Sequence, residues 1–440
     1  MSKAYENISL MLKVILGFAL VVAGVAFRPI MYLAALFFVA VILIEKNPRY
    51  IASMMFAWLS ISPIFKFSVG GTSFFTYLEL LVIIKLLIIN RKLEVKFFAA
   101  LALYSAYMMI GMGNEYTDLI KAICVPMLIY FFFKDMSYLS LKSCTFYYIV
   151  GIVISSVIGL AKAFIPNMTA FVNYKNVRMG QSASSIIFAD RFSGLWTDPN
   201  YFSIHLIIAI AVISVLFSRK EIRSTTFYAV YALMVAFGAL TGSKSFILML
   251  VVVTVLSVIV LLKEGQYAHS VLFGIVIAIG VFLLMSGYID VFSRAIYRIQ
   301  NVSTLGFDTG RSDIWKGYFD MYFDSLPLML FGSGLGKSFL LRVPHNTYLD
   351  IFVLFGIVGG ILCIATFHYA IKPRTISMKP QSIVPLITLA AMYFALSMYY
   401  SVELPFQMII VFGYCYLSPD TQNDSMAMES YNAETTGGEI

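Results

Sequence analysis

Residues 288–349 read YIDVFSRAIYRIQNVSTLGFDTGRSDIWKGYFDMYFDSLPLMLFGSGLGKSFLLRVPHNTYL and form a long polar stretch between apolar segments. The stretch carries six basic and five acidic side chains, together with one of the four histidines of the protein. The sequence on both sides is almost continuously hydrophobic. Loops held by a rigid scaffold often carry binding and catalytic residues. We therefore expect the apolar segments to form a scaffold for this loop and for one shorter partner loop.

The composition indicates a membrane protein with many spans. The chain has 440 residues, of which 60% are hydrophobic and only 12% are charged, and its mean hydropathy is +0.87. Because about 20 apolar residues cross a bilayer as a helix, the long uncharged runs predict an all-α polytopic membrane protein with about 12–14 transmembrane helices and two longer outer loops. The first run, 8–27, is too long for a signal peptide and lacks a small-residue cleavage site, so we expect a retained span.

The expected spans form one domain, residues 1–417, without an internal repeat. In chain order they lie near residues 8–27, 29–44, 51–69, 74–90, 97–113, 118–133, 144–165, 199–217, 225–241, 244–262, 270–287, 347–371, 382–400 and 404–417. Pro63, Pro126 and Pro405 are expected to kink or end their helices. The remaining tail, 418–440, is polar with only acidic charges, which predicts a disordered cytoplasmic end.

The distribution of basic residues predicts the orientation in the membrane. With the N-terminus inside, most basic residues outside the long loops fall on the inner side, and the short outer loops keep only Arg28, Lys66, Lys121 and Lys244. This bias follows the positive-inside rule, so the net charge of +8 is a topology signal and predicts no nucleic-acid partner. Both long loops, near 166–200 and 288–346, are then outside, and both termini are cytoplasmic.

No motif predicts a metal ion or a cofactor. The four cysteines lie in or beside apolar runs without paired spacing, as small core residues do: Cys124, Cys144, Cys363 and Cys415. No Asp-x-Asp occurs, so a metal-held nucleotide substrate has no obvious site. The segment 332–338, GSGLGKS, resembles a phosphate loop, but Phe331 stands where that loop requires its first glycine.

The first long loop places an arginine close to the start of a span. Arg191 stands a few residues before the eighth expected span, whose N-terminus faces outward. A guanidinium added to the positive end of a helix dipole favours a phosphate group. An arginine that only anchors the membrane interface explains the same spacing equally well. Asp198 before Pro199 predicts a helix cap with the proline at the first helical position, and Asn200 follows.

The second long loop adds arginines and a histidine. Arg294 and Arg298 stand four residues apart, at helical spacing, and Arg311 follows Gly310. Such arginines either form solvated ion pairs with neighbouring aspartates or hold a diphosphate through charge-assisted hydrogen bonds. Their predicted position on the outer face, shared with Arg191, favours the diphosphate.

Only one of the four histidines is expected to act in chemistry. His345 lies at the outer mouth of the twelfth span, where a histidine can take a proton from a hydroxyl group or, more commonly, cap a helix end. The other histidines lie within spans or at their inner ends and are interpreted as structural: His205, His269 and His368.

Several short motifs, taken in order, resemble a known family. They are Arg191-x-x-Gly194, Asp198-Pro199-Asn200, Thr241-Gly242-Ser243-Lys244, Gly310-Arg311-x-x-x-Trp315, Gly332-x-Gly334-x-Gly336 and His345-Asn346-x-x-Leu349. This order, with the two loops on one face, resembles the O-antigen polymerase and O-antigen ligase superfamily over residues 180–370. The family usually has arginine where this chain has Lys244.

The resemblance implies a metal-independent, inverting glycosyltransferase of the membrane-embedded C type. Such enzymes take glycan from a polyprenyl-diphosphate donor at the periplasmic face of the bacterial inner membrane. Arg191 and Arg311 would hold the diphosphate, and His345 would orient or deprotonate the acceptor hydroxyl. The expected substrate-binding residues are Arg294, Arg298, Asn200, Lys244, Asn346 and Tyr348. Membrane lipids and a chain-length regulator are further expected partners, and no cofactor is expected.

Three functions stay open at this point. A polymerase joins one lipid-linked glycan, of O-antigen, capsule or exopolysaccharide, to another, and we prefer it because polymerases are the most sequence-diverse members of the family. A ligase passes the glycan to a lipid A core sugar or to a protein. A flippase or other transporter would need ionisable residues within its spans, and Glu79 and Lys85 are the best candidates. These two stand six residues apart and so do not share one helical face.

Overall fold

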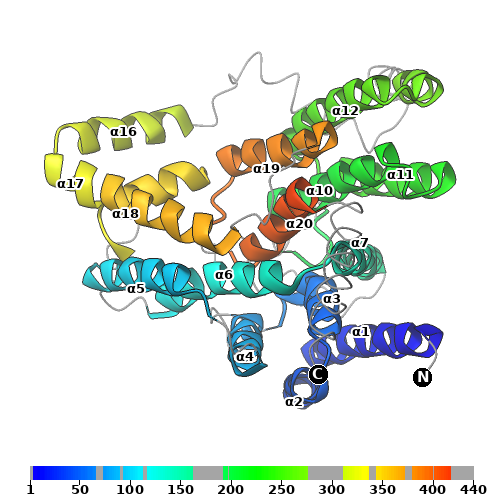
Figure 1. Ribbon diagram of the computed structural model, residues 1–440, viewed down its shortest axis with the longest axis horizontal. Helices are drawn as coiled ribbons and strands as arrows, with labels where there is room; N and C mark the ends of the chain where they lie inside the picture. Colours follow the sequence, from blue (N-terminus) through cyan, green and yellow to red (C-terminus); the bar gives the residue numbers. More distant parts are fainter. Residues whose placement is uncertain are drawn as a thin grey trace, which may run out of the picture.

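The architecture is that of a computed structural model, drawn as a ribbon in Figure 1. It describes residues 3–65, 73–89, 93–111, 116–161, 192–196, 198–275, 311–335, 343–371, 379–399 and 401–417. Arg191, Arg294, Arg298 and the tail 418–440 lie outside the described residues, as does most of the first long loop. What we predict for them remains a prediction.

The described residues form helices joined by short connections, and no strand occurs among them. The helices are α1 (Lys3–Ala26), α2 (Arg28–Ile44), α3 (Pro48–Trp58), η1 (Leu59–Ile61), α4 (Phe74–Ile89), α5 (Val95–Ile110), α6 (Tyr116–Asp135), α7 (Tyr138–Ala161), α10 (Pro199–Ser218), α11 (Ser224–Leu240), α12 (Lys244–Lys263), α16 (Arg311–Phe323), α17 (Leu326–Phe331), α18 (Thr347–Ile371), η5 (Pro380–Ser382), α19 (Ile383–Ala395) and α20 (Leu404–Tyr416).

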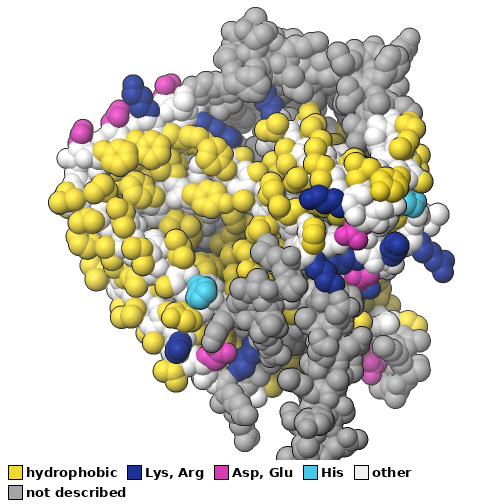
Figure 2. All heavy atoms as spheres, turned by 45° about the horizontal axis from the view of Figure 1, so that its top comes forward, with side chains coloured by type: hydrophobic (Ala, Val, Ile, Leu, Met, Phe, Trp, Pro, Cys, Tyr) yellow, Lys and Arg dark blue, Asp and Glu magenta, His cyan; other side chains and the backbone are white. Residues whose placement is uncertain are grey.

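Many of these helices are suited to a membrane. Within the described ranges, five combine enough length and hydropathy to cross a bilayer: Glu6–Ala26 in α1, and α7, α10, α12 and α18. Shorter apolar helices, including α2, α5, α11 and α20, accompany them. Figure 2 shows hydrophobic side chains over much of one face, with charged side chains gathered mainly toward its margins. The protein is therefore an all-α protein of membrane type, and the number of about 12–14 spans remains a prediction.

Helix α10 occupies the centre of the bundle. Its residues from Phe202 to Ser218 are all buried, and it packs against α7, α11, α12, α19 and α20 (Figure 1). A helix that is hydrophobic all round lies in a protein core or crosses a membrane, and the burial of α10 on every side by other helices places it in the core of the bundle. The outer helices instead expose large apolar side chains on one side, as Leu36 in α2 and Ile364 in α18 do.

The two ends of α10 define two ends of the bundle, about 30 Å apart at 1.5 Å per residue. At the Arg219 end, Arg219 donates from Nη2 to the carbonyl oxygen of Tyr414 at 3.0 Å, and Lys142 pairs with Glu221 at 2.9 Å. At the Asp198 end, helices α7 and α11 finish while α10, α12 and α18 begin. Lys142 and Arg219, predicted to share the inner side, thus lie at the same end. The assignment of the Asp198 end to the outside remains a prediction.

Two expected spans are shorter than predicted. In the span expected over 51–69, α3 ends at Trp58 and η1 at Ile61, close to the helix-breaking Pro63. In the span expected over 382–400, α19 ends at Ala395, and Leu396 is extended with φ −140° and ψ 147°. Pro126, in contrast, lies inside α6, which continues through it. Residues 396–399 and 401–403, which we name the α19–α20 connector, form hydrogen bonds to neighbouring helices in place of further helical turns.

Helix α18 is interrupted at Gly356, whose φ of 62° is outside the helical region. The interruption frees carbonyl groups that must be satisfied, because an unpaired backbone group is costly away from water. The backbone N–H of Ser333 donates to Val353 O, and that of Gly334 donates to Leu354 O, both at 2.9 Å. The segment after α17 therefore fills the break in α18.

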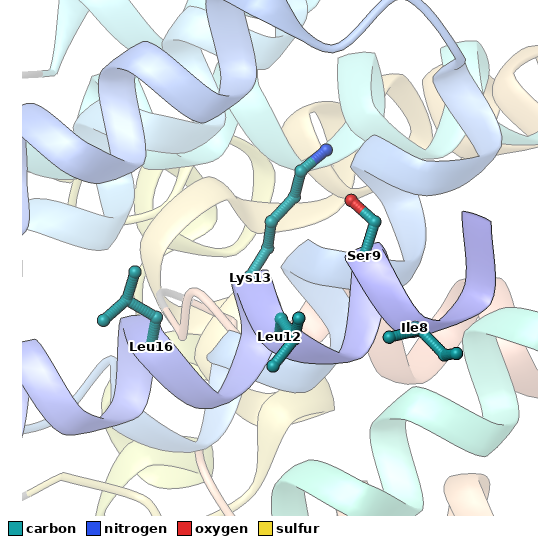
Figure 3. Close-up of a pocket in the computed structure, with 5 residues that line it drawn as sticks. All are labelled: Ile8, Ser9, Leu12, Lys13 and Leu16. Atoms are coloured by element: carbon teal, nitrogen blue, oxygen red, sulfur yellow. The ribbon is translucent and has the colours of Figure 1, made fainter. Parts of the chain in front are cut away.

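A pocket runs along α1, at the opposite margin of the bundle from α16 (Figures 1 and 3). The residues that line it are Ile8, Ser9, Leu12, Lys13 and Leu16, which all belong to this one helix. Lys13 pairs with Glu45, at the end of α2, at 2.7 Å. The pocket therefore contains none of the predicted site residues.

Candidate functional site

Helix α16 bridges the start of α18 and the end of α19 at the Asp198 end. Arg311 opens the helix and donates from Nη1 to the carbonyl oxygen of Ala395 at 3.1 Å. One turn later, Trp315 donates its indole N–H to the carbonyl oxygen of Pro344 at 2.7 Å and packs edge-on against Phe394. Residues four apart lie on the same helical face. The spacing of Arg311 and Trp315 thus fixes α16 to two other elements at once.

The residue that follows Pro344 is His345, which has an unusual backbone conformation. Its φ of 53° lies in the left-handed region, which residues other than glycine rarely adopt. Strain of this kind persists where the surroundings impose it, and it clusters at functional sites. The His345 side chain stays exposed. The next residue, Asn346, is buried and caps α18, because its Oδ1 accepts from the backbone N–H groups of Tyr348 and Leu349 at 3.0 and 3.1 Å.

The start of α10 forms the second side of the site. Asp198 caps this helix by accepting from the backbone N–H of Asn200 at 2.7 Å, with Pro199 in the first turn, as predicted from the sequence. Asn200 in turn accepts at Oδ1 from the hydroxyl of Ser243 at 2.9 Å. Ser243 is the capping residue of α12. The starts of α10 and α12 are therefore bonded together.

Asp198, at the start of α10, interacts electrostatically with Arg311 and His345 on the other side of the site. Partial desolvation and the neighbouring Arg311 guanidinium lower the pKa of His345 below its usual value, and the Asp198 carboxylate opposes this shift. Burial likewise lowers the pKa of Arg311, and Asp198 again acts in the opposite direction. Each group thus lies within electrostatic reach of the other two. We name Asp198, Arg311 and His345 the outer-end site, because the Asp198 end is the one predicted to face outward.

The structure brings some predicted site residues together and sets others apart. Arg311 lies within electrostatic reach of His345, and their joint role in a site remains a prediction. Lys244 is the exposed first residue of α12, next to Ser243. Tyr348 is directed toward α19, because its hydroxyl donates to the carbonyl oxygen of Ala390 at 3.1 Å. Arg191 is not described, but the backbone N–H of Phe192, the residue after it, bonds Leu240 O at the end of α11.

The first two glycines of the glycine-rich segment, Gly332 and Gly334, are structural in this fold. A Cβ on Gly332 would stand 2.4 Å from the carbonyl oxygen of Leu354, and one on Gly334 would stand 2.8 Å from the backbone of Gly111. Both glycines have positive φ. The glycines therefore permit close backbone approach, which explains their spacing without a phosphate loop.

Known proteins give no independent assignment. No protein-family model, no curated protein and no solved structure matches the chain. Within the described ranges, no group of three or more His, Cys, Asp and Glu side chains is arranged to hold a metal ion. All four cysteines are buried and free, which confirms their interpretation as core residues.

Sequence reasoning missed two contributions to the site. The sequence marks Asp198 as a helix cap and as part of the motif Asp198-Pro199-Asn200, and neither signal indicates its proximity to Arg311 and His345, more than a hundred residues away. The carbonyl oxygen of Ala395 holds Arg311, although the sequence predicts a continuous helix there. No local pattern could have indicated either contact.

Proposed function

We propose that the protein transfers glycan from a polyprenyl-diphosphate donor to a sugar hydroxyl, and that it polymerises lipid-linked oligosaccharide repeat units. The observation that supports this proposal best is the gathering of Arg311, His345 and Asp198 at one end of an apolar helix bundle. A donor with a lipid tail would reach such a site from the membrane. The motif order that resembles the O-antigen polymerase and ligase superfamily gives the substrate class.

Arg311 is assigned to the leaving group. When the bond between the anomeric carbon and the diphosphate oxygen breaks, the polyprenyl diphosphate departs with concentrated negative charge. An arginine stays protonated in proteins, and a fixed guanidinium stabilises charge as it develops. The bond from Arg311 Nη1 to Ala395 O holds one arm of the guanidinium, so the side chain is oriented before the donor arrives.

His345 is assigned to the acceptor hydroxyl. The acceptor oxygen attacks the anomeric carbon on the face opposite the leaving group and must give up its proton. The pKa of His345 is lowered, so the imidazole is neutral at pH 7 and can accept that proton. The exposed side chain then returns the proton to water.

Transport is a weaker alternative because one of its two supporting residues has a structural role. Lys85 donates from Nζ to the carbonyl oxygens of Ile42 and Leu43, at 2.5 and 2.9 Å, and so neutralises the C-terminal end of α2. Glu79 alone remains as a buried ionisable residue in α4.

The decisive experiment uses the purified protein in lipid with a polyprenyl-diphosphate-linked oligosaccharide and a metal chelator. We expect glycan of more than one repeat on the lipid, with release of polyprenyl diphosphate. Movement of intact donor across the bilayer without new glycosidic bonds would contradict the proposal and favour transport. A strict requirement for Mg²⁺ or Mn²⁺ would contradict the metal-independent mechanism.

A deletion strain separates polymerase from ligase. Loss of the polymerase leaves single-repeat glycan on the cell surface. Loss of a ligase removes surface glycan while lipid-linked polymer accumulates. We expect the first phenotype.

A further inference from the structure

The α19–α20 connector, together with Ala395 directly before it, contacts each of the segments that carry the outer-end site. Thr347, two residues after His345, donates its hydroxyl to Leu396 O at 2.6 Å and accepts from the backbone N–H of Met398 at 2.9 Å. In α10, Tyr201 donates its hydroxyl to Ser397 O at 2.7 Å. Ala395, just before the connector, accepts from Arg311. A displacement of the connector would therefore move the supports of all three site residues.

Glu403 holds the far end of the connector. Its carboxylate accepts from the indole N–H of Trp196 at 2.7 Å through Oε1 and from the hydroxyl of Ser401 at 2.6 Å through Oε2. Trp196 stands two residues before Asp198. Glu403 thus ties the connector directly to the segment that presents the capping aspartate.

The carboxylate of Glu403 also faces a buried histidine. Glu403 is 5% exposed and His205 is fully buried, and His205 Nε2 lies 3.7 Å from Glu403 Oε2. His205 Nδ1 lies 2.7 Å from the Tyr148 hydroxyl, and its Nε2 lies 3.4 Å from Gln407 Nε2. A carboxylate is costly to bury unless several donors satisfy it. This network therefore specifies one position for Glu403, and hence for Trp196 and the connector.

We propose that Glu403 is a positioning residue that sets the relative placement of Asp198, Arg311 and His345 through the α19–α20 connector. Its carboxylate is buried in the interior of the bundle, where it is held among Trp196, Ser401 and His205. The effect on catalysis rests on the proposed glycosyl transfer. The effect on the geometry of the outer-end site does not.

The test compares Glu403→Gln with Glu221→Gln. The first variant keeps an oxygen that can accept from Trp196 but removes the charge that faces His205. The control removes a comparable partly buried carboxylate, paired with Lys142 at 2.9 Å, at the Arg219 end. Both proteins are labelled with 5-fluorotryptophan, and the three tryptophan signals are assigned by replacing Trp58, Trp196 and Trp315 in turn with phenylalanine.

The signal of Trp315 decides the matter, because Trp315 contacts Pro344 and Phe394 and not Glu403. We expect Glu403→Gln to shift the signals of both Trp196 and Trp315, and Glu221→Gln to shift neither. A shift of Trp196 alone, with Trp315 unchanged, would show that Glu403 acts only locally and would overturn the proposal. Equal shifts of Trp315 in the two variants would also overturn it, because they would reflect a general loosening of the bundle.

Turnover supplies the second measurement. If the protein is the proposed transferase, Glu403→Gln should lower kcat by about 10²-fold, the size expected when reacting groups are misplaced by about 1 Å, with less effect on donor KM. Full turnover despite a shifted Trp315 signal would overturn the catalytic part of the proposal. If the wild-type protein transfers no glycan, the proposed function fails, while the fluorine signals still decide whether Glu403 positions the site.

Discussion

Trp315 donates its indole N–H to the carbonyl oxygen of Pro344, the residue directly before His345, at 2.7 Å. This hydrogen bond connects α16 to a backbone segment whose next residue has a positive φ. A single hydrogen bond contributes only about 1 kcal/mol to stability. Its importance is geometric, because it fixes the segment that presents the proposed base beside the helix that presents Arg311.

Replacement of Trp315 by phenylalanine should therefore impair function more than stability. We expect Trp315→Phe to lower the transfer rate by about tenfold or more through misplacement of His345, with the protein still inserted in the membrane. The matched control is Trp58→Phe, because Trp58 also donates its indole N–H to a backbone oxygen, that of Val14, at 3.3 Å. A greater loss of activity from Trp58→Phe than from Trp315→Phe would contradict this prediction.

Gly356 should be irreplaceable, whereas Gly360 in the same helix should not be. A Cβ on Gly356 would stand 2.5 Å from the backbone of Leu330, and its φ of 62° is unfavourable for alanine. A Cβ on Gly360 meets nothing within 4 Å. We expect Gly356→Ala to lose folded protein, with a cost of at least about 1–3 kcal/mol from backbone strain, and Gly360→Ala to be neutral or slightly stabilising. Thermal unfolding in detergent measures both. Equal stability of the two variants would show that α18 is not interrupted at Gly356.

The helices were largely predictable from the sequence, and their interruptions were not. Apolar runs such as 244–262, in which Lys244 is the one charged residue, predict α12 closely because hydrocarbon length and helix length are coupled. The end of α19 at Ala395 was not predictable in this way, because residues 396–399 carry no charged side chain and yet leave the helix to form hydrogen bonds with α18. The interruption of α18 at Gly356 was not predictable either, because the residues around Gly356 also carry no charge.

Of the three residues of the candidate site, the sequence predicts Arg311 and His345 but neither the role of Asp198 nor the assembly of the three. Arg311 and His345 are polar residues beside apolar runs, so composition alone marks them out. Asp198 has a clear capping signal, but this local signal does not indicate its electrostatic influence on Arg311 and His345. Glu403 and His205 lie next to or within spans, where single buried polar residues are usually structural. Only the folded arrangement shows that Trp196 links Glu403 to the segment before Asp198.

The orientation can be tested with two exposed lysines at opposite ends of the bundle. Lys244 starts α12 at the Asp198 end, and Lys220 follows α10 at the Arg219 end. All four native cysteines are buried, so they interfere little with labelling. We expect a membrane-impermeant thiol reagent to label Lys244→Cys in intact spheroplasts, and Lys220→Cys only after the membrane is opened. The reverse pattern would invert the topology and place the outer-end site in the cytoplasm.

Arg311→Lys should retain a positive charge but lose the planar guanidinium. Lysine cannot present two parallel donors to a diphosphate while a third bonds Ala395 O. We expect weaker donor handling, seen as a rise in donor KM together with a fall in kcat. The control is Lys316→Arg, an exchange of the same two residue types on the exposed face of α16. If Arg311→Lys is as active as Lys316→Arg, bidentate contact with the donor is not required.

The final prediction concerns the pH dependence of transfer. The pKa of His345 lies below its usual value of about 6.5 because of desolvation and the charge of Arg311. A base acts when it is unprotonated, so the rate should rise with pH through this pKa and level off above it. Arg311→Gln removes one of the two lowering influences, so the residual activity should have its midpoint at higher pH, closer to 6.5. Lys316→Gln, which removes a positive charge further along the same helix, should leave the midpoint in place.

Replacement of His345 completes this test. In His345→Asn, the new side chain is compatible with the positive φ of this position but cannot act as the base. The variant therefore distinguishes a role of the backbone conformation from a role in proton transfer. We expect a rate lower by about 10²–10⁴-fold, with the acidic limb of the pH profile abolished and donor binding largely intact. Protein level and membrane insertion are measured beside activity, since a residue needed only for folding would reduce those first. An unchanged acidic limb in His345→Asn would assign the titrating base to another residue, even if the overall rate fell.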